Sequence, residues 1–234
     1  MKIITWNCNG AFRKKVHALD DLKADICIIQ ECENPAESTL HFRSWATNYL
    51  WVGTSRHKGI GIFARPEIQL TKLDWADEGL QSFLPCRVND AFDLVAVWTK
   101  YANSPNFRYI GQLWKYLQLH GQKLAGKSAV VAGDLNSNTC WDEWDRWWNH
   151  SDVVNMLADL GLQSVYHSYF KEKQGQETRP TLYHQRNEDK PYHVDYAFVS
   201  ADVYDPALGT VEIGDKSEWL TLSDHMPLIF LIRV

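Results

Sequence analysis

The sequence lacks the features that mark membrane, disulfide-rich and strongly basic proteins. No apolar run approaches the ~18 residues that a membrane-spanning helix needs, and the opening Met1–Trp6 is too short and too soon interrupted to predict a signal peptide. The five cysteines are odd in number and no two have CxxC spacing, so no disulfide framework is expected and a reducing, cytoplasmic location fits best. The net charge of −5 argues against a basic protein that coats long nucleic acid.

The chain also lacks recognisable linkers, low-complexity segments and internal repeats. Its 234 residues, of which 45% are hydrophobic, are enough to build one substantial core. We therefore expect a single domain that spans residues 1–234.

Short apolar runs alternate with a few amphipathic stretches. Strands are predicted at Lys2–Trp6, Ile26–Ile29, Ala46–Val52, Ile60–Ala64, Ile68–Leu73, Phe92–Trp98, Ser128–Ala132, His193–Val199, Val211–Ile213 and Leu228–Arg233. Helices are predicted near Phe12–Leu22, from a cap at Ser104-Pro105 through Leu117, and over Val153–Leu160 between the Ser151-Asp152 cap and Gly161. The polar stretch Tyr166–Lys190 is expected to be a surface loop around a short strand at Thr181–Tyr183. Several strands are nearly all apolar, so two sheets stacked face to face with helices outside are expected.

Polar side chains recur where these strands begin or end. The clusters are Asn7-Cys8-Asn9-Gly10, Gln30-Glu31, Gly133-Asp134-Leu135-Asn136 and Ser223-Asp224-His225. Strand ends can meet at one edge of a sheet, and α/β folds place their active sites at such an edge. We therefore expect carboxylates, amides and an imidazole to converge there.

Each cluster also has a plainer structural interpretation. Asn9-Gly10 is a strong turn signal, Glu31 can be an ordinary exposed acid, and Asp134 can form an Asp-turn. A single histidine is more often structural than catalytic, so only its Ser-Asp-His context distinguishes His225 from the other eight histidines. The order and convergence of the clusters favour the functional interpretation.

Four tryptophans and a histidine follow the Asp134–Asn136 cluster. If they are exposed, they can stack on nucleobases, at about 1–3 kcal/mol each; if they are buried, they form the aromatic face of a helix, and partial burial is favoured. The histidine can face a substrate, although a role near a helix cap is favoured. These residues are Trp141, Trp144, Trp147, Trp148 and His150.

Taken in order, the clusters resemble the motifs of the endonuclease/exonuclease/phosphatase superfamily, which includes exonuclease III-type, DNase I-type and sphingomyelinase-type enzymes. The motifs that carry the resemblance are Trp6-Asn7-Cys8-Asn9-Gly10, Gln30-Glu31, Gly133-Asp134-Leu135-Asn136, His193-Val194-Asp195-Tyr196 and Ser223-Asp224-His225. The resemblance implies a four-layer α/β sandwich of two stacked mixed β-sheets flanked by helices, as in DNase I-like folds. It also implies divalent-metal-dependent cleavage of phosphate esters.

The resemblance assigns roles to individual residues. It implies a metal site at Glu31, Asp224 and Asn7, where oxygen ligands accept Mg²⁺ or Mn²⁺. Asp134 is expected to orient or deprotonate the attacking water, and Asn136 is expected to bind the scissile phosphate.

The last two catalytic residues are expected to act as a pair. Asp195 should contact His225, fix its tautomer and favour the imidazolium. The charged ring is then expected to donate a hydrogen bond to the phosphate.

The chain departs from the family pattern at three places. Asn9 stands where the family often has Asp, and His193 stands where it often has Arg. Lys100 and Tyr101 follow a strand after which the family often has His or Tyr. We expect these four residues, with Asn7, to contact substrate, but the sequence does not choose between Lys100 and Tyr101, and either can simply be loop.

The expected function is that of a metal-dependent phosphodiesterase of the nuclease type that acts on DNA or RNA. An esterase for small or lipid phosphate esters is the alternative, and the net charge of −5 is compatible with such a substrate. A non-catalytic binding module is the least favoured, because every carboxylate that the chemistry needs is present. Nothing in the sequence indicates a membrane span or an obligate protein partner.

Overall fold

The computed structural model describes residues 1–76, 78–101, 104, 106–207 and 209–233. The first sheet contains, in spatial order, β13 (Val211–Ile213), β14 (Leu228–Leu231), β1 (Lys2–Asn7), β2 (Ile26–Cys32), β4 (Lys58–Ala64) and β3 (Tyr49–Ser55). The second contains β5 (Leu70–Lys72), β6 (Phe83–Val88), β7 (Phe92–Trp98), β8 (Ala129–Asp134), β12 (Asp195–Ser200) and β9 (Leu162–Ser164). A two-stranded ribbon pairs β10 (Leu182–Tyr183) with β11 (Pro191–Tyr192).

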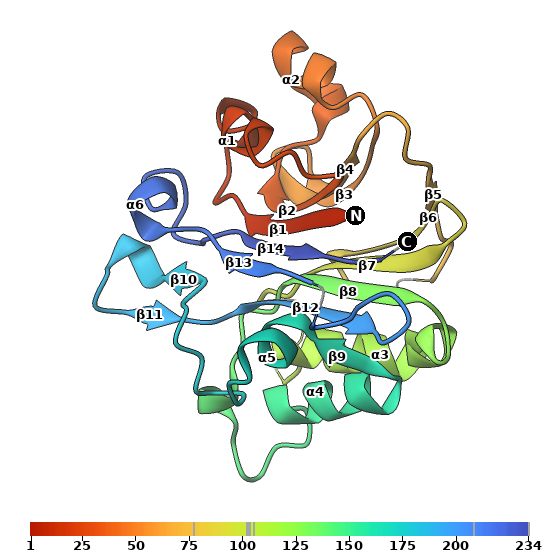
Figure 1. The fold of residues 1–234 in the computed structure, drawn as a ribbon, viewed down its shortest axis with the longest axis vertical. Coiled ribbons are helices and arrows are strands. Elements are labelled where there is room, and N and C mark those ends of the chain that lie inside the picture. The colour runs from red at the N-terminus through yellow and green to blue at the C-terminus, as the bar shows by residue number, and fades with distance from the viewer. Residues whose placement is uncertain (77, 102–103, 105, 208, 234) are drawn as a thin grey trace.

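α1 and α2 lie on the outer side of the first sheet, α3, α4 and α5 lie on the outer side of the second, and α6 lies at one edge (Figure 1). The α-helices are α1 (His17–Asp20), α2 (Leu40–Trp45), α3 (Ile110–Leu124), α4 (His150–Asp159), α5 (Val165–Phe170) and α6 (Lys216–Trp219). The 3₁₀ helices are η1 (Phe12–Lys14), η2 (Pro35–Glu37), η3 (Thr139–Trp141) and η4 (His184–Arg186). Each large sheet contains one parallel pair among antiparallel ones, β1 with β2 and β7 with β8. The predicted fold class, two stacked mixed sheets flanked by helices, is confirmed.

Alternation along the strands builds three apolar layers. In β1, Ile3 packs between the two sheets, whereas the next residue, Ile4, packs outward with the residues of η1 and α1. In β7, Leu94 faces the first sheet and Val95 packs in the layer beneath α3. Successive side chains of a strand point to opposite faces, and here both faces are buried. The strands are therefore nearly continuous apolar runs, and each fully buried large side chain contributes about 1.5–3 kcal/mol.

Strand direction brings the polar clusters to one edge of the sandwich. β1 and β2 are parallel, and their register pairs Asn7 with Gln30 at their carboxyl ends. β12 runs antiparallel to β8, so Asp195, at the start of β12, pairs with Asp134, at the end of β8. β14 runs antiparallel to β1, so the segment that contains His225 enters the first sheet at the same edge.

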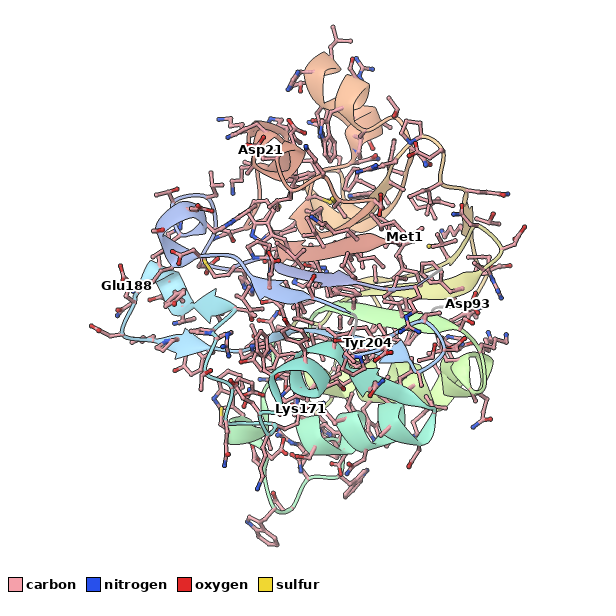
Figure 2. All side chains as sticks on the ribbon, in the orientation of Figure 1. Met1, Asp21, Asp93, Lys171, Glu188 and Tyr204 are labelled. Atoms are coloured by element: carbon pink, nitrogen blue, oxygen red, sulfur yellow. The ribbon has the colours of Figure 1, made fainter. Side chains whose placement is uncertain are left out.

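The β10–β11 ribbon and α6 lie at this edge, on the left of Figure 1. Leu182 of the ribbon forms a β-bridge with His225, which ties the ribbon to the site. In Figure 2, Glu188 marks the outer end of the ribbon, and Asp93, at the start of β7, lies at the opposite edge of the molecule.

The prediction of a surface loop at Tyr166–Lys190 is wrong for the first residues of this stretch. Val165–Phe170 form α5, and Tyr166 is fully buried, with its ring centroid 4.3 Å from that of His193. The aromatic residues of this stretch are mixed with polar ones, so the sequence pattern did not indicate that some of them are buried. The short strand predicted at Thr181–Tyr183 is present as β10.

Helix boundaries also differ from the predictions. α3 begins at Ile110, later than the predicted cap; Pro105 lies outside the described residues, and Ser104 Oγ instead accepts a hydrogen bond from the Phe107 N–H at 3.2 Å. α4 begins earlier than predicted, because the Asn149 N–H donates to Asp152 Oδ2 at 2.7 Å and closes a cap one turn upstream.

Some elements were missed or were shorter than predicted. The helix expected near Phe12–Leu22 consists of two short pieces, η1 and α1. The sequence did not predict β6, β9, β11, α2, α5 or α6, most of which are short, and Pro85 and Arg87 interrupt the apolar pattern of β6.

No helix among the described residues combines the length and apolarity needed to cross a membrane. The five cysteines are free thiols, and all except Cys140 are buried.

Candidate active site

A buried carboxylate–imidazole pair lies at the centre of the candidate site. His225 Nδ1 is 2.9 Å from Asp195 Oδ2, and both side chains are buried. Thr181 Oγ1 accepts hydrogen bonds from the N–H groups of Val194 and Asp195, at 2.9 and 3.0 Å, and so fixes the start of β12. The expected contact between Asp195 and His225 is present.

The segment around His225 is held from the first sheet. Ser223 Oγ donates to the Asn7 carbonyl at 2.7 Å and accepts from the His225 N–H at 3.0 Å. Trp6 Nε1 donates to the His225 carbonyl at 2.9 Å. Two neighbouring residues of β1 therefore fix the backbone on which the imidazole stands.

Asp134 lies next to this pair and is fully buried. Its Oδ2 accepts from Asn7 Nδ2 at 2.9 Å and from Asn136 Nδ2 at 2.8 Å, and its Oδ1 accepts from the Asn136 N–H at 2.8 Å. The preceding Gly133 has φ +154°, and a Cβ there would lie 1.8 Å from the Val97 carbonyl oxygen. Only glycine therefore lets β8 approach β7 closely enough to position Asp134.

A chain of amides links Asp134 to two further carboxylates. Asn7 Nδ2 also lies 3.3 Å from Glu31 Oε1, and Asn7 Oδ1 accepts from the Asn9 N–H at 3.0 Å. Asn9 Nδ2 donates to Asp224 Oδ1 at 2.8 Å. The structure thus joins the predicted residues Asn7, Asn9, Glu31, Asp134, Asn136, Asp195, Asp224 and His225 into one connected group.

Three members of this group have a left-handed backbone. Asn9, Glu31 and Asn136 have φ values of 51°, 62° and 44°. Asn tolerates this region, but for Glu it costs energy, of the order of 1 kcal/mol or more. At Glu31 the register of β2 against β4 shifts, as in a β-bulge, which re-aims the side chain. Strained residues held by their surroundings are common at functional sites.

Burial and charge shift the pKa values of two central groups. Burial raises the pKa of Asp134 from 3.8 to about 7, against the opposing effects of the His225 charge and the Asn7 hydrogen bond. Burial alone would lower the pKa of His225, but the charges of Asp195 and Asp134 raise it to about 10. Near neutral pH the ring is therefore an imidazolium, and Asp134 titrates where a general base works best.

Two neighbouring groups of side chains could hold a metal ion. Asp134, Asp195 and His225 offer ligand atoms within 4.8 Å of one another. A protonated imidazole is not a metal ligand, so His225 would have to give up the proton that the charges of Asp195 and Asp134 favour before it could bind a metal ion. Glu31, Asp224 and Asn7 instead offer only carboxylate and amide oxygens, which are the ligands that Mg²⁺ and Mn²⁺ prefer.

A lysine that the sequence did not single out contacts this oxygen-rich group. Lys58 Nζ lies 2.6 Å from Glu31 Oε2. Lys58 Nζ also lies 5.8 Å from the centre of the Trp98 ring, and Lys100 Nζ lies 4.8 Å from it. The carboxylate of Glu31 therefore attracts a cation in this structure, which is consistent with a cation-binding role.

The remaining predicted substrate ligands occupy different positions. Burial lowers the pKa of Lys100, and the nearby charge of Lys58 lowers it further, whereas the charge of Glu31 raises it. Tyr101 is 61% exposed. His193 is not brought into the connected group, since its Nδ1 lies 2.9 Å from the Arg179 carbonyl oxygen. Contact of these residues with substrate stays a prediction.

The tryptophan cluster is partly exposed. Trp144 is 97% exposed, Trp147 66% and Trp141 42%, whereas Trp148 packs against Phe107 at 4.6 Å. A cavity of about 650 Å³ opens between this cluster and Asn136.

The adjacent histidine lies inside the protein. His150 is fully buried, 4.9 Å from the Tyr196 ring, and it is the first residue of α4. This position is consistent with the favoured helix-start interpretation.

Several residues that shape the site were not predicted from the sequence. Lys58 occurs in the basic run Arg56-His57-Lys58 at a hairpin, and this run carries no signal of a partner at Glu31. Thr181 begins the short strand predicted at Thr181–Tyr183, but nothing in the sequence marks its hydroxyl as the acceptor for the Val194 and Asp195 N–H groups. The hydroxyl of Ser223 was visible in the Ser-Asp-His motif, but its bond to the Asn7 carbonyl depends on the packing of β1.

Structural comparison shows that the fold is shared with nucleic-acid enzymes. The chain is similar to the 3′-5′ exonuclease NExo from Neisseria meningitidis, with a TM-score of 0.74, 19% identity and 100% of both chains covered. It is similar to the 3′ phosphatase NExo from Neisseria bound to a product DNA hairpin, with a TM-score of 0.75, 18% identity and 100% of both chains covered. It is also similar to an AP endonuclease from Archaeoglobus fulgidus, with a TM-score of 0.73, 18% identity and 100% of both chains covered.

A search of curated protein sequences finds no significant match. The model of the Endonuclease/Exonuclease/phosphatase family, however, matches residues 4–225. This range contains all the polar clusters that meet at the edge of the sandwich. The chain therefore belongs to the Endonuclease/Exonuclease/phosphatase family.

Proposed function

We propose that this protein is a divalent-metal-dependent phosphodiesterase that hydrolyses DNA or RNA. The observation that carries the proposal is the buried group of Asp134, Asp195 and His225, joined by Asn7 to the carboxylate of Glu31. Such a group combines a proton acceptor, a charged donor and oxygen ligands within one connected network. Metal-assisted hydrolysis of a phosphodiester can use all three.

Asp134 is the group suited to accept a proton from the attacking water. Burial raises its pKa to about 7, so its carboxylate is present near neutral pH and is still basic enough to take a proton. Its three hydrogen bonds, to Asn7 and Asn136, hold it in one orientation. A positioned base of this kind contributes typically about 10²- to 10⁴-fold.

Two side chains, one with a free N–H group and one with its N–H groups engaged, lie where they can meet the negative charge that develops on the phosphate. Asp195 occupies Nδ1 of His225, so the other ring nitrogen is the one that donates to substrate. Asn136 Nδ2 donates to Asp134 Oδ2 and to the Thr99 carbonyl, so both of its N–H groups are engaged and one of these bonds would have to open before it donates to the phosphate. A donor fixed before the reaction, as Asp195 fixes His225, stabilises developing charge without reorganisation.

Glu31, Asp224 and Asn7 are the residues that would hold Mg²⁺ or Mn²⁺. Their oxygen donors fit a hard cation, and the contact of Glu31 with the Lys58 ammonium shows that this carboxylate already takes a positive partner. A divalent cation there would polarise the phosphate and offset its charge.

Nucleic acid is the favoured substrate. The similar structures include a protein named as an exonuclease, one named as an AP endonuclease, and one bound to a product DNA hairpin. The net charge of −5 remains the feature that favours a small phosphate ester instead.

Two variants and a substrate panel test the proposal. Asp134→Ala and His225→Ala should each lower turnover of bis(p-nitrophenyl) phosphate with Mg²⁺ or Mn²⁺ by about 10²-fold or more. Unchanged activity in both variants would contradict the mechanism. The panel is single-stranded DNA, duplex DNA with an abasic site, RNA and small phosphate esters, and turnover of the small esters alone would exclude a nuclease.

A further inference from the structure

A cavity of about 650 Å³ with no assigned role lies beside the site. Asn136 and Val194 line it, and Val194 directly precedes Asp195 of the buried pair. Leu182, which also lines it, forms the β-bridge with His225. The cavity therefore opens directly beside the residues proposed to bind and cleave the phosphodiester, on the side of the second sheet.

Aromatic side chains form its walls. Trp141 and Tyr192 lie against each other, with ring centroids 5.1 Å apart and planes at 44°. Tyr109, which is 41% exposed, and Trp148 also line the cavity. Flat, partly exposed rings are surfaces on which nucleobases stack, whatever the base.

The wall that carries Trp141 is built rigidly. Arg146 donates from Nη2 to the Trp141 carbonyl at 2.7 Å and from Nε to Asn149 Oδ1 at 2.7 Å. Asp142, the next residue after Trp141, accepts from the N–H groups of His150 and Ser151, at 2.8 and 3.2 Å. The loop is thus fastened to the start of α4, and a wall fixed in advance loses less entropy when a ligand binds.

The wall that carries Tyr109 has a strained backbone. Tyr109, which precedes α3, has φ 49° and ψ −117°, a conformation that is unfavourable for a tyrosine. Its N–H donates to the Lys100 carbonyl at 3.1 Å, which helps to hold this conformation. Strain of this kind persists where the surrounding structure enforces it and is concentrated at ligand sites.

Polar and charged groups complete the lining. They are Asn106, Arg108, Ser137, Glu143, Arg146 and His184. These side chains supply both hydrogen-bond donors and acceptors, which the edge of a base requires. Two of them are arginines, which suits a ligand attached to phosphate.

We propose that this cavity receives the base and sugar of one unpaired nucleotide next to the phosphodiester that is cleaved. The inference rests on the proposed nuclease function and specifies its substrate as a strand with intact, unpaired bases. The volume falls in the range of about 300–1,000 Å³ that encloses a drug-sized ligand, so a bare abasic sugar would leave the aromatic wall unfilled. A paired base would first have to leave its stack, at a cost that an unpaired base avoids.

The test compares strands that differ only in their bases. One single-stranded oligonucleotide carries thymine at every position, and the other, of equal length, consists of abasic tetrahydrofuran units. An RNA strand of uracil nucleotides shows whether the sugar matters. The variants are Trp141→Ala and Tyr192→Ala, with Trp141→Phe to retain a ring. Trp144→Ala is the matched control, because Trp144 belongs to the same loop, is 97% exposed and does not line the cavity.

The wild-type protein should cleave the thymine strand about 10- to 100-fold better, in kcat/KM, than the abasic strand. Trp141→Ala should remove most of this preference, Trp141→Phe should restore part of it, and Trp144→Ala should leave it unchanged. Equal rates on the two strands, or equal effects of the Trp141 and Trp144 variants, would overturn the inference.

Binding separates this inference from the proposed function. Fluorescence anisotropy of the labelled strands should show tighter binding of the thymine strand and a selective loss in Trp141→Ala. If the thymine strand binds preferentially but no phosphodiester is hydrolysed with any metal, the proposed catalysis fails and the cavity assignment stands. If the two strands bind equally, the cavity assignment fails whatever the turnover.

Discussion

Replacement of Asp134 by Asn should abolish catalytic activity and, as the pH rises, increase the stability of the protein relative to the wild type. The carboxyl group is fully buried, and burial raises its pKa from 3.8 to about 7. In the unfolded chain the group ionises near its ordinary pKa, whereas in the folded protein it keeps its proton up to about pH 7. The folded state therefore binds more protons over this interval, and the free energy of unfolding of the wild type should fall as the pH rises.

The size of this fall follows from the shift. A rise of about three pKa units corresponds to about 4 kcal/mol, at 1.36 kcal/mol per unit. Asp134→Asn removes the titrating group, so its stability relative to the wild type should increase by up to about 4 kcal/mol between about pH 4 and about pH 7. His225 stays protonated over this interval in both proteins, because Asp195 still pairs with it. A mismatched amide facing the Asn136 N–H adds a cost of about 1–3 kcal/mol that does not depend on pH.

Urea unfolding followed by tryptophan fluorescence, in the presence of a chelator, measures this difference at each pH. Asp145→Asn is the control, because Asp145 is an exposed carboxylate on the tryptophan loop and its loss should change stability by less than about 0.5 kcal/mol. Parallel stability–pH curves for the wild type and Asp134→Asn would refute the raised pKa and with it the argument for Asp134 as the base. Catalytic activity of Asp134→Asn should be lost at every pH.

Three further predictions concern other parts of the site. Lys58→Met removes the ammonium that contacts Glu31, so isothermal titration should show Mg²⁺ or Mn²⁺ binding a few-fold tighter; weaker binding would mean that Lys58 supports the site. Gly133→Ala would place a Cβ 1.8 Å from the Val97 carbonyl oxygen, so thermal unfolding should show a loss of about 3 kcal/mol or more, and a stable variant would contradict the close approach of β7 and β8. Asp195→Asn should lower the pKa of His225 from about 10 by at least about one unit, which imidazole NMR should detect as an earlier loss of the proton with rising pH; an unchanged titration would exclude Asp195 as its main partner.

The sequence predicts the layered fold well because its strands are buried on both faces. Runs such as Phe92–Trp98 have no polar side to suggest exposure, and only stacked sheets with helices outside bury such runs completely. Elements with weaker patterns were missed. β6 is interrupted by Pro85, and α5 consists of aromatic residues mixed with polar ones.

The candidate site was predictable to the extent that it depends on strand ends. Asp134, Asp195 and His225 meet because β8, β12 and β14 have fixed directions, and the polar clusters mark those ends in the sequence. The contact of Lys58 with Glu31 was not predictable, since it depends on a shift of register in β2 and on the left-handed backbone of Glu31.

The cavity could not be predicted from the sequence for a related reason. Its walls come from the segment before α3, the loop after β8 and the β10–β11 ribbon, which are far apart along the chain. No local pattern records that Tyr109, Trp141 and Tyr192 surround one space. The tryptophan cluster suggested stacking, but only tertiary structure places Trp141 beside Asn136.

The reacting groups are divided between the two sheets, and this division has a consequence for how the protein responds to damage. Asn7 and Glu31 belong to the first sheet, and His225 lies just before its strand β14. Asp134 and Asp195 belong to the second sheet, and Asn136 lies just after its strand β8. Any slip along the seam between the sheets separates the proton acceptor from its charged neighbour before either sheet loses its own hydrogen bonds. Under mild denaturing conditions, enzymatic turnover should therefore fall before the circular dichroism signal of the strands and helices changes.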